Sequence, residues 1–165
     1  MKIPNLVEGD LKIRHAKTED IETMLYLSEG VDLSLLAGNR SGPVTAGFLG
    51  ELFSEFENNP DRTVYVIELE DKPCGWISCY TSVPSEGDLF IDAIVIGQAF
   101  RSRRNGSRAA ALIIDWANRH DELVTVIAGM DAGNDAAQMF WENLEFIPLE
   151  EKAGILTMVY QLGSD

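Results

Sequence analysis

The chain of 165 residues lacks the features of a membrane span, a secreted leader or a metal centre. No apolar run approaches the roughly 18 residues that a membrane-spanning helix needs. The first residues, MKIPNLVEGD, lack the apolar stretch of a signal peptide. The two histidines, His15 and His120, are isolated and form no ligand spacing with cysteines or carboxylates, so no metal site is expected. A cytoplasmic location is the default expectation.

Cysteine and basic residues are both scarce. Cys74 and Cys79 lie five positions apart in one strand-like segment, where alternation would place them on opposite faces and disfavour a disulfide. Lys and Arg number 13 against 27 Asp and Glu, which gives a formal net charge of −14. Such a chain is a poor general binder of nucleic acid or anionic membranes and mildly favours cationic partners.

The apolar residues are sufficient for one core. At 165 residues and 45% hydrophobic content, residues 1–165 are expected to form a single domain. Apolar periodicity predicts a helix with Leu49, Leu52, Phe53 and Phe56 inward. Another, over the segment 100–117, has Ala109, Leu112, Ile113 and Trp116 inward. Strands are predicted at 11–16, 63–70, 75–82, 87–97, 123–130, 145–150 and 154–162, and the element order is that of an α/β protein with one central sheet.

Four arginines gather at one turn of this acidic chain. FRSRRNGSRAAALIIDWA (100–117) carries Arg101, Arg103, Arg104 and Arg108 at the start of a predicted helix. Free amides at a helix start and guanidinium groups both bind phosphate oxygens, and Gly106 offers a close approach or a positive φ. The pattern indicates an anion site. The alternatives are a solvated loop whose arginines pair with surface carboxylates, and a nucleic-acid site, which fits the net charge poorly.

Asp92 stands inside the apolar strand GDLFIDAIVIG (87–97), whose two faces should both be buried. Alternation places it on the same face as Phe90 and Ile94. A buried carboxylate tends to have a raised pKa, which suits a base that takes a proton from an ammonium group. Asp92 is therefore a candidate base or ammonium anchor. The alternative is that it pairs with a buried arginine or caps backbone groups.

The run IVIGQAFRSRRNGSRAAALIIDWA resembles the acyl-coenzyme A site of the GNAT superfamily of N-acyltransferases. That site is a strand, a turn of the form [R/Q]-x-x-G-x-[G/A] and a helix. Arg101 matches the leading Arg or Gln and Gly106 the final Gly or Ala, whereas Arg104 replaces the usual middle glycine. The departure puts the usual tight turn in doubt, although the Arg104 side chain could reach a coenzyme A phosphate instead.

A second block supports the resemblance. NDAAQMFWENLEF (134–146) is similar to the family pattern N-x-x-A-x-x-[LF]-Y-x-K-x-G-F, with matches at Asn134, Ala137, Phe140 and Phe146 but not at Trp141, Asn143 and Glu145. The element order is also that of the family. The resemblance implies a central mixed, mostly antiparallel sheet of about six to seven strands flanked by about four helices.

The resemblance also implies a site for acetyl-CoA as cosubstrate. Backbone amides of 102–107 would hold the pyrophosphate, the strand around Ile94 and Ile96 would pair with the pantetheine arm, and Asn134 and Phe140 would contact the arm from the other side. In the family a Glu often occupies the position of Asp92. The expected acetyl-CoA contacts are Ile94, Val95, Ile96, Arg101, Ser102, Arg103, Arg104, Asn105, Gly106, Ser107, Asn134 and Phe140, with Asp92 as the catalytic residue.

Many family members place a Tyr at the position of Trp141 to protonate the leaving thiolate. An indole cannot supply that proton. The thiolate could be protonated by water, or Tyr80 or Tyr160 could reach the sulfur. As a third reading, the protein binds coenzyme A without efficient catalysis, with Trp141 a core aromatic.

The leading hypothesis is an N-acyltransferase that moves an acetyl group from acetyl-CoA to a primary amine of a small molecule or peptide in one ternary complex. The alternatives are a degenerate GNAT domain that senses acyl-CoA and an interaction module with a phosphate-docking loop. In this fold residues 17–58 build much of the acceptor pocket. Glu29 and Asp32, with Asp92, allow a polyamine, an aminoglycoside or a peptide N-terminus. No nucleic-acid or membrane partner is expected, and the family allows a homodimer.

Overall fold

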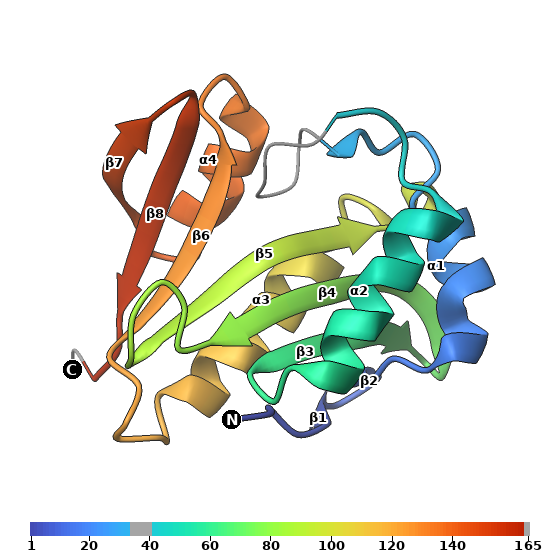
Figure 1. Cartoon of the computed structure of the whole chain (residues 1–165), viewed down its shortest axis with the longest axis horizontal. Coiled ribbons are helices and arrows are strands. Elements are labelled where there is room, and N and C mark those ends of the chain that lie inside the picture. The colour runs from blue at the N-terminus through green and yellow to red at the C-terminus, as the bar shows by residue number, and fades with distance from the viewer. Residues whose placement is uncertain (34–40, 164–165) are drawn as a thin grey trace.

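In the part of the chain that the structure describes, eight strands form one sheet in the order β1-β2-β3-β4-β5-β6-β8-β7 (Figure 1). The computed structural model describes residues 1–33 and 41–163. The strands are β1 (Leu6–Glu8), β2 (Leu11–His15), β3 (Arg62–Leu69), β4 (Lys72–Thr81), β5 (Asp88–Ile96), β6 (Thr125–Asp131), β7 (Ile147–Lys152) and β8 (Ile155–Gln161). Only β5 and β6 run parallel; the other neighbours are antiparallel. The predicted mixed, mostly antiparallel sheet is confirmed, with one strand more than expected because the short β1 was not foreseen.

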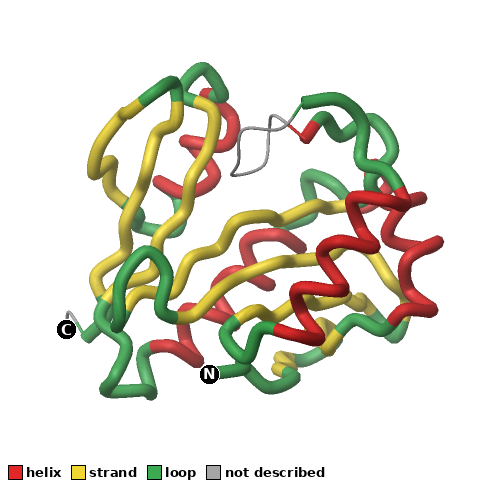
Figure 2. The backbone as a smooth tube through the Cα atoms, in the orientation of Figure 1, coloured by secondary structure: helices red, strands yellow, loops and turns green. Residues whose placement is uncertain are grey.

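Helices cover both faces of the sheet (Figure 2). They are α1 (Ile21–Leu27), α2 (Ala46–Asn58), α3 (Asn105–Ala117) and α4 (Asp135–Glu142). The inward residues predicted for α2 and α3 are all buried. The core has two parts: α1 and α2 pack on one face of the sheet, and α3 packs on the other. None of the described helices is long and apolar enough to cross a membrane.

The central strands β5 and β6 pair over only part of their length. Their register runs from Asp88 opposite Thr125 to Ile91 opposite Ala128 and stops there. Beyond Ile91, β5 continues along β4, while β6 continues along β8. Figure 1 shows the two strands separating toward the ends of their arrows. Among the residues that the structure describes, no strand pairs with the other edge of β5 beyond Ile91.

Strand β5 carries an irregularity at Asp92. Ser78 of β4 lies opposite Ala93, but the next residue, Cys79, lies opposite Ile91, so Asp92 is an extra residue in β5. An extra residue interrupts the alternation of faces. Ile91 accordingly packs in the α3-side core, whereas Ala93 packs in the α1/α2-side core. The expectation that both faces of this strand are buried is confirmed, but regular alternation through Asp92 was wrong.

The two cysteines show the same effect in β4. The register with β3 shifts between Ile67 and Glu68, which makes Cys74 an extra residue. Cys74 and Cys79 therefore both pack in the α3-side core, and the prediction of opposite faces is wrong. Both are buried free thiols.

Candidate active site

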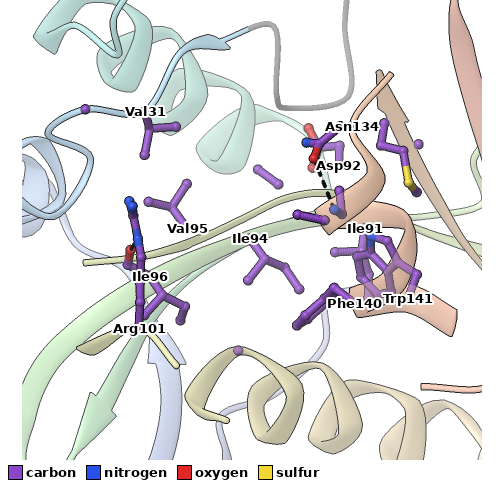
Figure 3. A pocket seen from close by; sticks show the side chains of 17 residues that line it. Val31, Ile91, Asp92, Ile94, Val95, Ile96, Arg101, Asn134, Phe140 and Trp141 are labelled. Atoms are coloured by element: carbon purple, nitrogen blue, oxygen red, sulfur yellow. Dashed lines mark hydrogen bonds between the residues drawn. The ribbon is translucent and has the colours of Figure 1, made fainter. Parts of the chain in front are cut away.

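A cavity of about 410 Å³ lies where β5 and β6 separate. Strand β5 lines it from Ile91 to Ile96, and Gly129 and Met130 of β6 and Asn134, Phe140 and Trp141 at α4 form the other wall. Gly30 and Val31, which follow α1, also contribute. In the view of Figure 3, Arg101 and Ile96 lie to the left of Ile94, and Phe140 and Trp141 lie to its right.

A second cavity of about 330 Å³ lies at the turn between β5 and α3. It shares Ile96, Arg101, Gly106 and Phe140 with the larger one, so the two form one continuous site. Its remaining lining comes from Phe100, Ser102, Arg104, Asn105 and Ser107. The structure thus brings the predicted turn residues together, except Arg103, which is exposed and lines neither cavity.

The turn presents backbone donors toward this second cavity. Arg104 is the N-cap of α3, and the helical hydrogen bonds begin with the Arg108 amide donating to the Arg104 carbonyl at 2.9 Å. The amides of Asn105, Gly106 and Ser107 precede that bond and have no acceptor within the helix. Asn105 is only 3% exposed, and its side chain donates to the Phe100 carbonyl at 3.1 Å, which fixes the turn. A helix start of this kind binds anions.

The residues of the turn that have a left-handed backbone conformation do not include its glycine. Ser102 and Arg104 have φ of 63° and 62°, whereas Gly106 lies within α3. The possibility of a positive φ at Gly106 is therefore not realised, and Arg104 adopts the conformation that a glycine favours. Gly106 instead packs closely between two side chains, because a Cβ atom there would lie 3.4 Å from both Ile96 Cγ1 and Phe140 Cε2.

Three of the four arginines divide between two roles. Arg101 and Arg104 line the cavity at the turn. The Arg101 Nε atom donates to the Ile96 carbonyl at 2.9 Å. Arg108 points elsewhere, because its Nη2 atom pairs with Asp10 at 2.7 Å and contacts the Glu8 carbonyl at 3.3 Å. The surface-pairing alternative thus holds for Arg108.

The backbone of β5 offers a free edge to the cavity. The Gly97 amide donates to the Cys74 carbonyl of β4 at 2.8 Å, so the odd-numbered residues at this end of the strand face β4. Alternation then turns the backbone groups of Ile94 and Ile96 away from β4, toward the edge that β6 has left. An extended ligand with amide groups can pair with such an edge as an added strand.

Asn134 and the aromatic residues of α4 form the opposite wall. The Asn134 side-chain oxygen accepts from the Ala137 amide at 3.1 Å and caps the helix, as the dashed line in Figure 3 shows. The Phe140 and Trp141 rings meet edge to face with centroids 4.9 Å apart. Trp141 is 6% exposed and packs on Phe146, so it is a core aromatic that also lines the cavity.

Among the residues that the structure describes, no tyrosine lines the cavity between β5 and β6. The Tyr80 hydroxyl donates to Glu55 at 2.7 Å, and the Tyr160 ring packs against Phe146. The idea that either phenol reaches a thiol at this position gains no support from the structure.

Asp92 lines the cavity and forms an ion pair beneath it. Its side chain is 15% exposed, and its Oδ2 atom lies 3.2 Å from Nη2 of Arg62, which is 3% exposed. Burial raises the pKa of Asp92 to about 6, although the Arg62 charge acts in the opposite direction. The alternative of pairing with a buried arginine is thus realised at a position that also faces the cavity. Sequence reasoning did not identify Arg62; its only signal was a charged residue at the start of an apolar strand.

The acceptor side is described in part. Glu29 lies with Glu22 and Tyr26 around a neighbouring cavity of about 480 Å³, which shares Gly30 with the cavity between β5 and β6. The Asp32 carboxylate accepts from the Gly42 amide at 3.3 Å. Residues 34–40 of the predicted acceptor loop lie outside the described residues.

Comparison with known proteins agrees with this arrangement. Residues 35–146 match the model of the acetyltransferase (GNAT) family. No curated protein matches the chain by sequence.

Several solved structures share the fold. An acetyltransferase from Thermus thermophilus has a TM-score of 0.79 at 16% identity, covering 93% of this chain and 98% of that one. A spermidine N-acetyltransferase from Vibrio cholerae, solved with CoA and spermine, has a TM-score of 0.74 at 12% identity, with coverage of 93% and 96%. A ribosomal-protein-alanine N-acetyltransferase from Brucella melitensis has a TM-score of 0.68 at 22% identity, with coverage of 91% and 99%.

Proposed function

Because the chain belongs to the GNAT acetyltransferase family, we propose that it transfers an acetyl group from acetyl-CoA to a primary amine of a small molecule or peptide. The observation that carries this proposal is the continuous site that runs from Asp92, along the free edge of β5, to the start of α3. It combines a carboxylate at one end with an anion site at the other.

The residues of the site fit an extended acyl-CoA. The free amides at the start of α3, with Arg101 and Arg104, are donors for a pyrophosphate. The edge of β5 that β6 has left suits the amide groups of a pantetheine arm at Ile94 and at the Ile96 amide, whereas the Ile96 carbonyl already accepts from Arg101. Gly106, Ile96 and Phe140 line both cavities, and a glycine at this position adds no side chain to their lining. Acetyl-CoA would supply the activated thioester.

Asp92 is the proposed acceptor of the amine proton. A primary amine with a pKa of about 8 to 10 is mostly ammonium at neutral pH and must lose a proton before its lone pair attacks a carbonyl carbon. A carboxylate with a pKa near 6 is charged at neutral pH and a stronger base than an ordinary aspartate. Asp92 can take the proton directly or through a water, and it also attracts the ammonium group.

The remaining chemistry falls to the backbone and to solvent. The Ile94 amide, on the free edge of β5, can donate to the carbonyl oxygen on which charge develops. The departing thiolate would be protonated by water, because Trp141 stands where an acid would be placed. Direct attack in a ternary complex is favoured, because Cys74 and Cys79 are both buried and burial raises the pKa of Cys74 to about 11.

A cationic acceptor suits the charge of the chain. The formal net charge is −14, and Glu22 and Glu29 lie around the neighbouring cavity that shares Gly30 with the site. Two structural neighbours are named for a polyamine and for a ribosomal-protein alanine, and both kinds of amine are included in the proposal.

One alternative has its own support. Arg104 in a left-handed conformation and Trp141 in place of a tyrosine depart from the family pattern at both ends of the site. A domain that binds acyl-CoA as a sensor would need the anion site and the β5 edge but no proton transfer.

The test is free-thiol release from acetyl-CoA with a panel of polyamines, aminoglycosides and peptides with free N-termini. The proposal predicts turnover with at least one class. For that amine, Asp92→Asn should lose most of the activity, and what remains should lack the acidic limb of the pH–rate profile near pH 6. Coenzyme A binding by calorimetry without turnover on any amine would favour the sensor. Full activity of Asp92→Asn with an unchanged acidic limb would remove the proton-acceptor role.

A further inference from the structure

The ion pair beneath the cavity is part of a larger cluster around Arg62. The guanidinium of Arg62 lies 3.2 Å from Asp92 Oδ2 and 3.5 Å from Glu55 Oε2. Its central carbon stacks 3.9 Å from the centre of the Tyr80 ring, and the Tyr80 hydroxyl donates to the same Glu55 oxygen at 2.7 Å. Tyr80 and Glu55 thus hold the guanidinium from two sides while its Nη2 atom reaches Asp92.

The sheet places this cluster directly under the site. Arg62 opens β3 and lies opposite Tyr80 of β4, which lies opposite Phe90 of β5. The extra residue in β5 follows two positions later, at Asp92. Asp92 therefore meets both the guanidinium below the sheet and the cavity between β5 and β6.

The cluster is poorly arranged as a device for stability. Arg62 Nε, Ser78 Oγ and Asp92 Oδ1 are all buried, and none has a hydrogen-bond partner in the described part of the chain. Burying charges is costly, and a buried pair with unsatisfied atoms contributes less to stability than a well-packed apolar group. Features of this kind in a folded protein concentrate at functional sites.

We propose that Arg62 is the positioning residue of this site: its guanidinium, held by Tyr80 and Glu55, fixes the Asp92 carboxylate at the cavity and keeps it charged to receive the amine proton. The catalytic consequence rests on the proposed acetyl transfer. The effect of Arg62 on the charge of Asp92 does not depend on it.

The charges around Asp92 come from few groups. Strand β3 provides Arg62, and α2 provides Glu55, which disfavours the charged form of Asp92. Strand β4 provides Tyr80, the Ser78 hydroxyl and Cys79, whose thiol stays neutral because burial raises its pKa. Gly30, Val31 and the β6 and α4 residues that line the cavity between β5 and β6 carry no charge. Arg62 is thus the one cation that offsets the burial of Asp92 among the residues described.

The direct test is a titration of Asp92 that needs no turnover. NMR of protein labelled with ¹³C at the aspartate carboxyl groups, assigned with Asp92→Asn, reports the Asp92 pKa. Arg62→Gln should raise that pKa by about one to three units, because the Arg62 charge is the largest of the effects that oppose the burial of Asp92. In Arg62→Lys, which keeps the positive charge, the Asp92 pKa should stay close to its wild-type value. An Asp92 titration unchanged in Arg62→Gln would overturn the proposal.

The pH–rate profile gives the second readout. In Arg62→Gln the acidic limb of the pH–rate profile should move to higher pH by the same amount as the Asp92 pKa. The loss of rate should then be about fivefold or more greater at pH 6 than at high pH. In an Asp92→Asn background, Arg62→Gln should have no further effect on the profile. A uniform loss of rate at every pH would mean that Arg62 acts only on the fold.

Glu55→Gln keeps the test available if Arg62→Gln does not fold. Glu55 is 52% exposed on α2, so its replacement disturbs the core little. Removing this negative charge should shift the Asp92 titration downward, opposite to Arg62→Gln, and no shift would contradict the proposed cluster. If the Asp92 titration responds as predicted but no amine is acetylated, the proposed function is refuted and the effect of Arg62 on Asp92 is not.

Discussion

Gly106 of α3 and Phe140 of α4 approach so closely that a Cβ atom on the glycine would lie 3.4 Å from the phenylalanine ring. The same atom would lie 3.4 Å from Ile96 on the other side. All three residues line both the cavity at the turn and the cavity at Asp92. A ligand that occupies both cavities would lie against them.

Gly106→Val should therefore weaken acetyl-CoA binding about tenfold or more, a loss of about 1.4 kcal/mol, because its methyl groups would enter the cavities that this glycine lines or displace Ile96 and Phe140. Calorimetry with coenzyme A measures the affinity, and circular dichroism checks the fold. Gly50→Ala on α2, where an added Cβ meets nothing within 4 Å, is the matched control and should leave affinity unchanged. Equal affinities for the two variants would show that the ligand does not pass Gly106.

Arg104→Glu should weaken coenzyme A binding, and the loss should shrink as salt is added, because the change places a carboxylate beside the phosphate site. Arg108→Gln is the control from the same turn, since Arg108 pairs with Asp10 away from the cavity. It should keep the wild-type affinity. If calorimetry finds the affinity of Arg104→Glu unchanged, Arg104 has no place in the site.

Arg104→Gly should leave the free energy of unfolding unchanged or raise it by up to about 1 kcal/mol, since a left-handed residue with a Cβ carries a cost of that order. Arg104→Ala keeps the Cβ and should show no such gain. Urea unfolding of both variants measures the difference. A clear loss of stability in Arg104→Gly would mean that the arginine side chain makes contacts that outweigh the backbone conformation.

Asp20→Asn should destabilise the protein by about 1–3 kcal/mol at neutral pH, because Asp20 accepts two hydrogen bonds from Arg14 at 2.8 and 2.9 Å. Arg14 holds the pKa of Asp20 below its ordinary value. A carboxyl whose pKa is lower in the folded chain stabilises above its unfolded pKa of about 3.9 and loses that contribution as the pH falls through the folded value.

The difference between wild type and Asp20→Asn should accordingly be full at pH 7 and vanish toward about pH 2. Asp71→Asn is the control, because Asp71 is 95% exposed and lies 3.9 Å from Lys12. Its unfolding midpoint in urea should match wild type. An Asp20→Asn deficit that is the same at both pH values would show that the charge of Asp20 is not its cause.

Much of the fold follows from local patterns. The apolar face of α2, with Leu49, Leu52, Phe53 and Phe56, follows from helical spacing alone and is buried as predicted. Strand β1 escaped prediction because three residues that are mostly exposed carry too little pattern. The faces around Cys74 and Asp92 were predicted wrongly because each is an extra residue in its strand, and a register shift depends on the neighbouring strand.

The candidate site could likewise be predicted from the sequence only in part. The turn and the wall of α4 could be located because their motifs are continuous in sequence, and the structure gathers Arg101, Gly106, Asn134 and Phe140 around one site. The Arg62 partner of Asp92 could not be located, because the pair is formed by the sheet. The left-handed Arg104 was equally hidden, since only glycine signals such a conformation in a sequence.

The measurement that tests the central claim most directly uses acetyl-CoA labelled with ¹³C in the acetyl group and mass spectrometry of both amine and protein. The account predicts a labelled acetyl amide on an amine of the panel, formed only when protein and both substrates are present, with no label on the protein. Coenzyme A binding without label on any amine, or label retained on the protein before transfer, would contradict it.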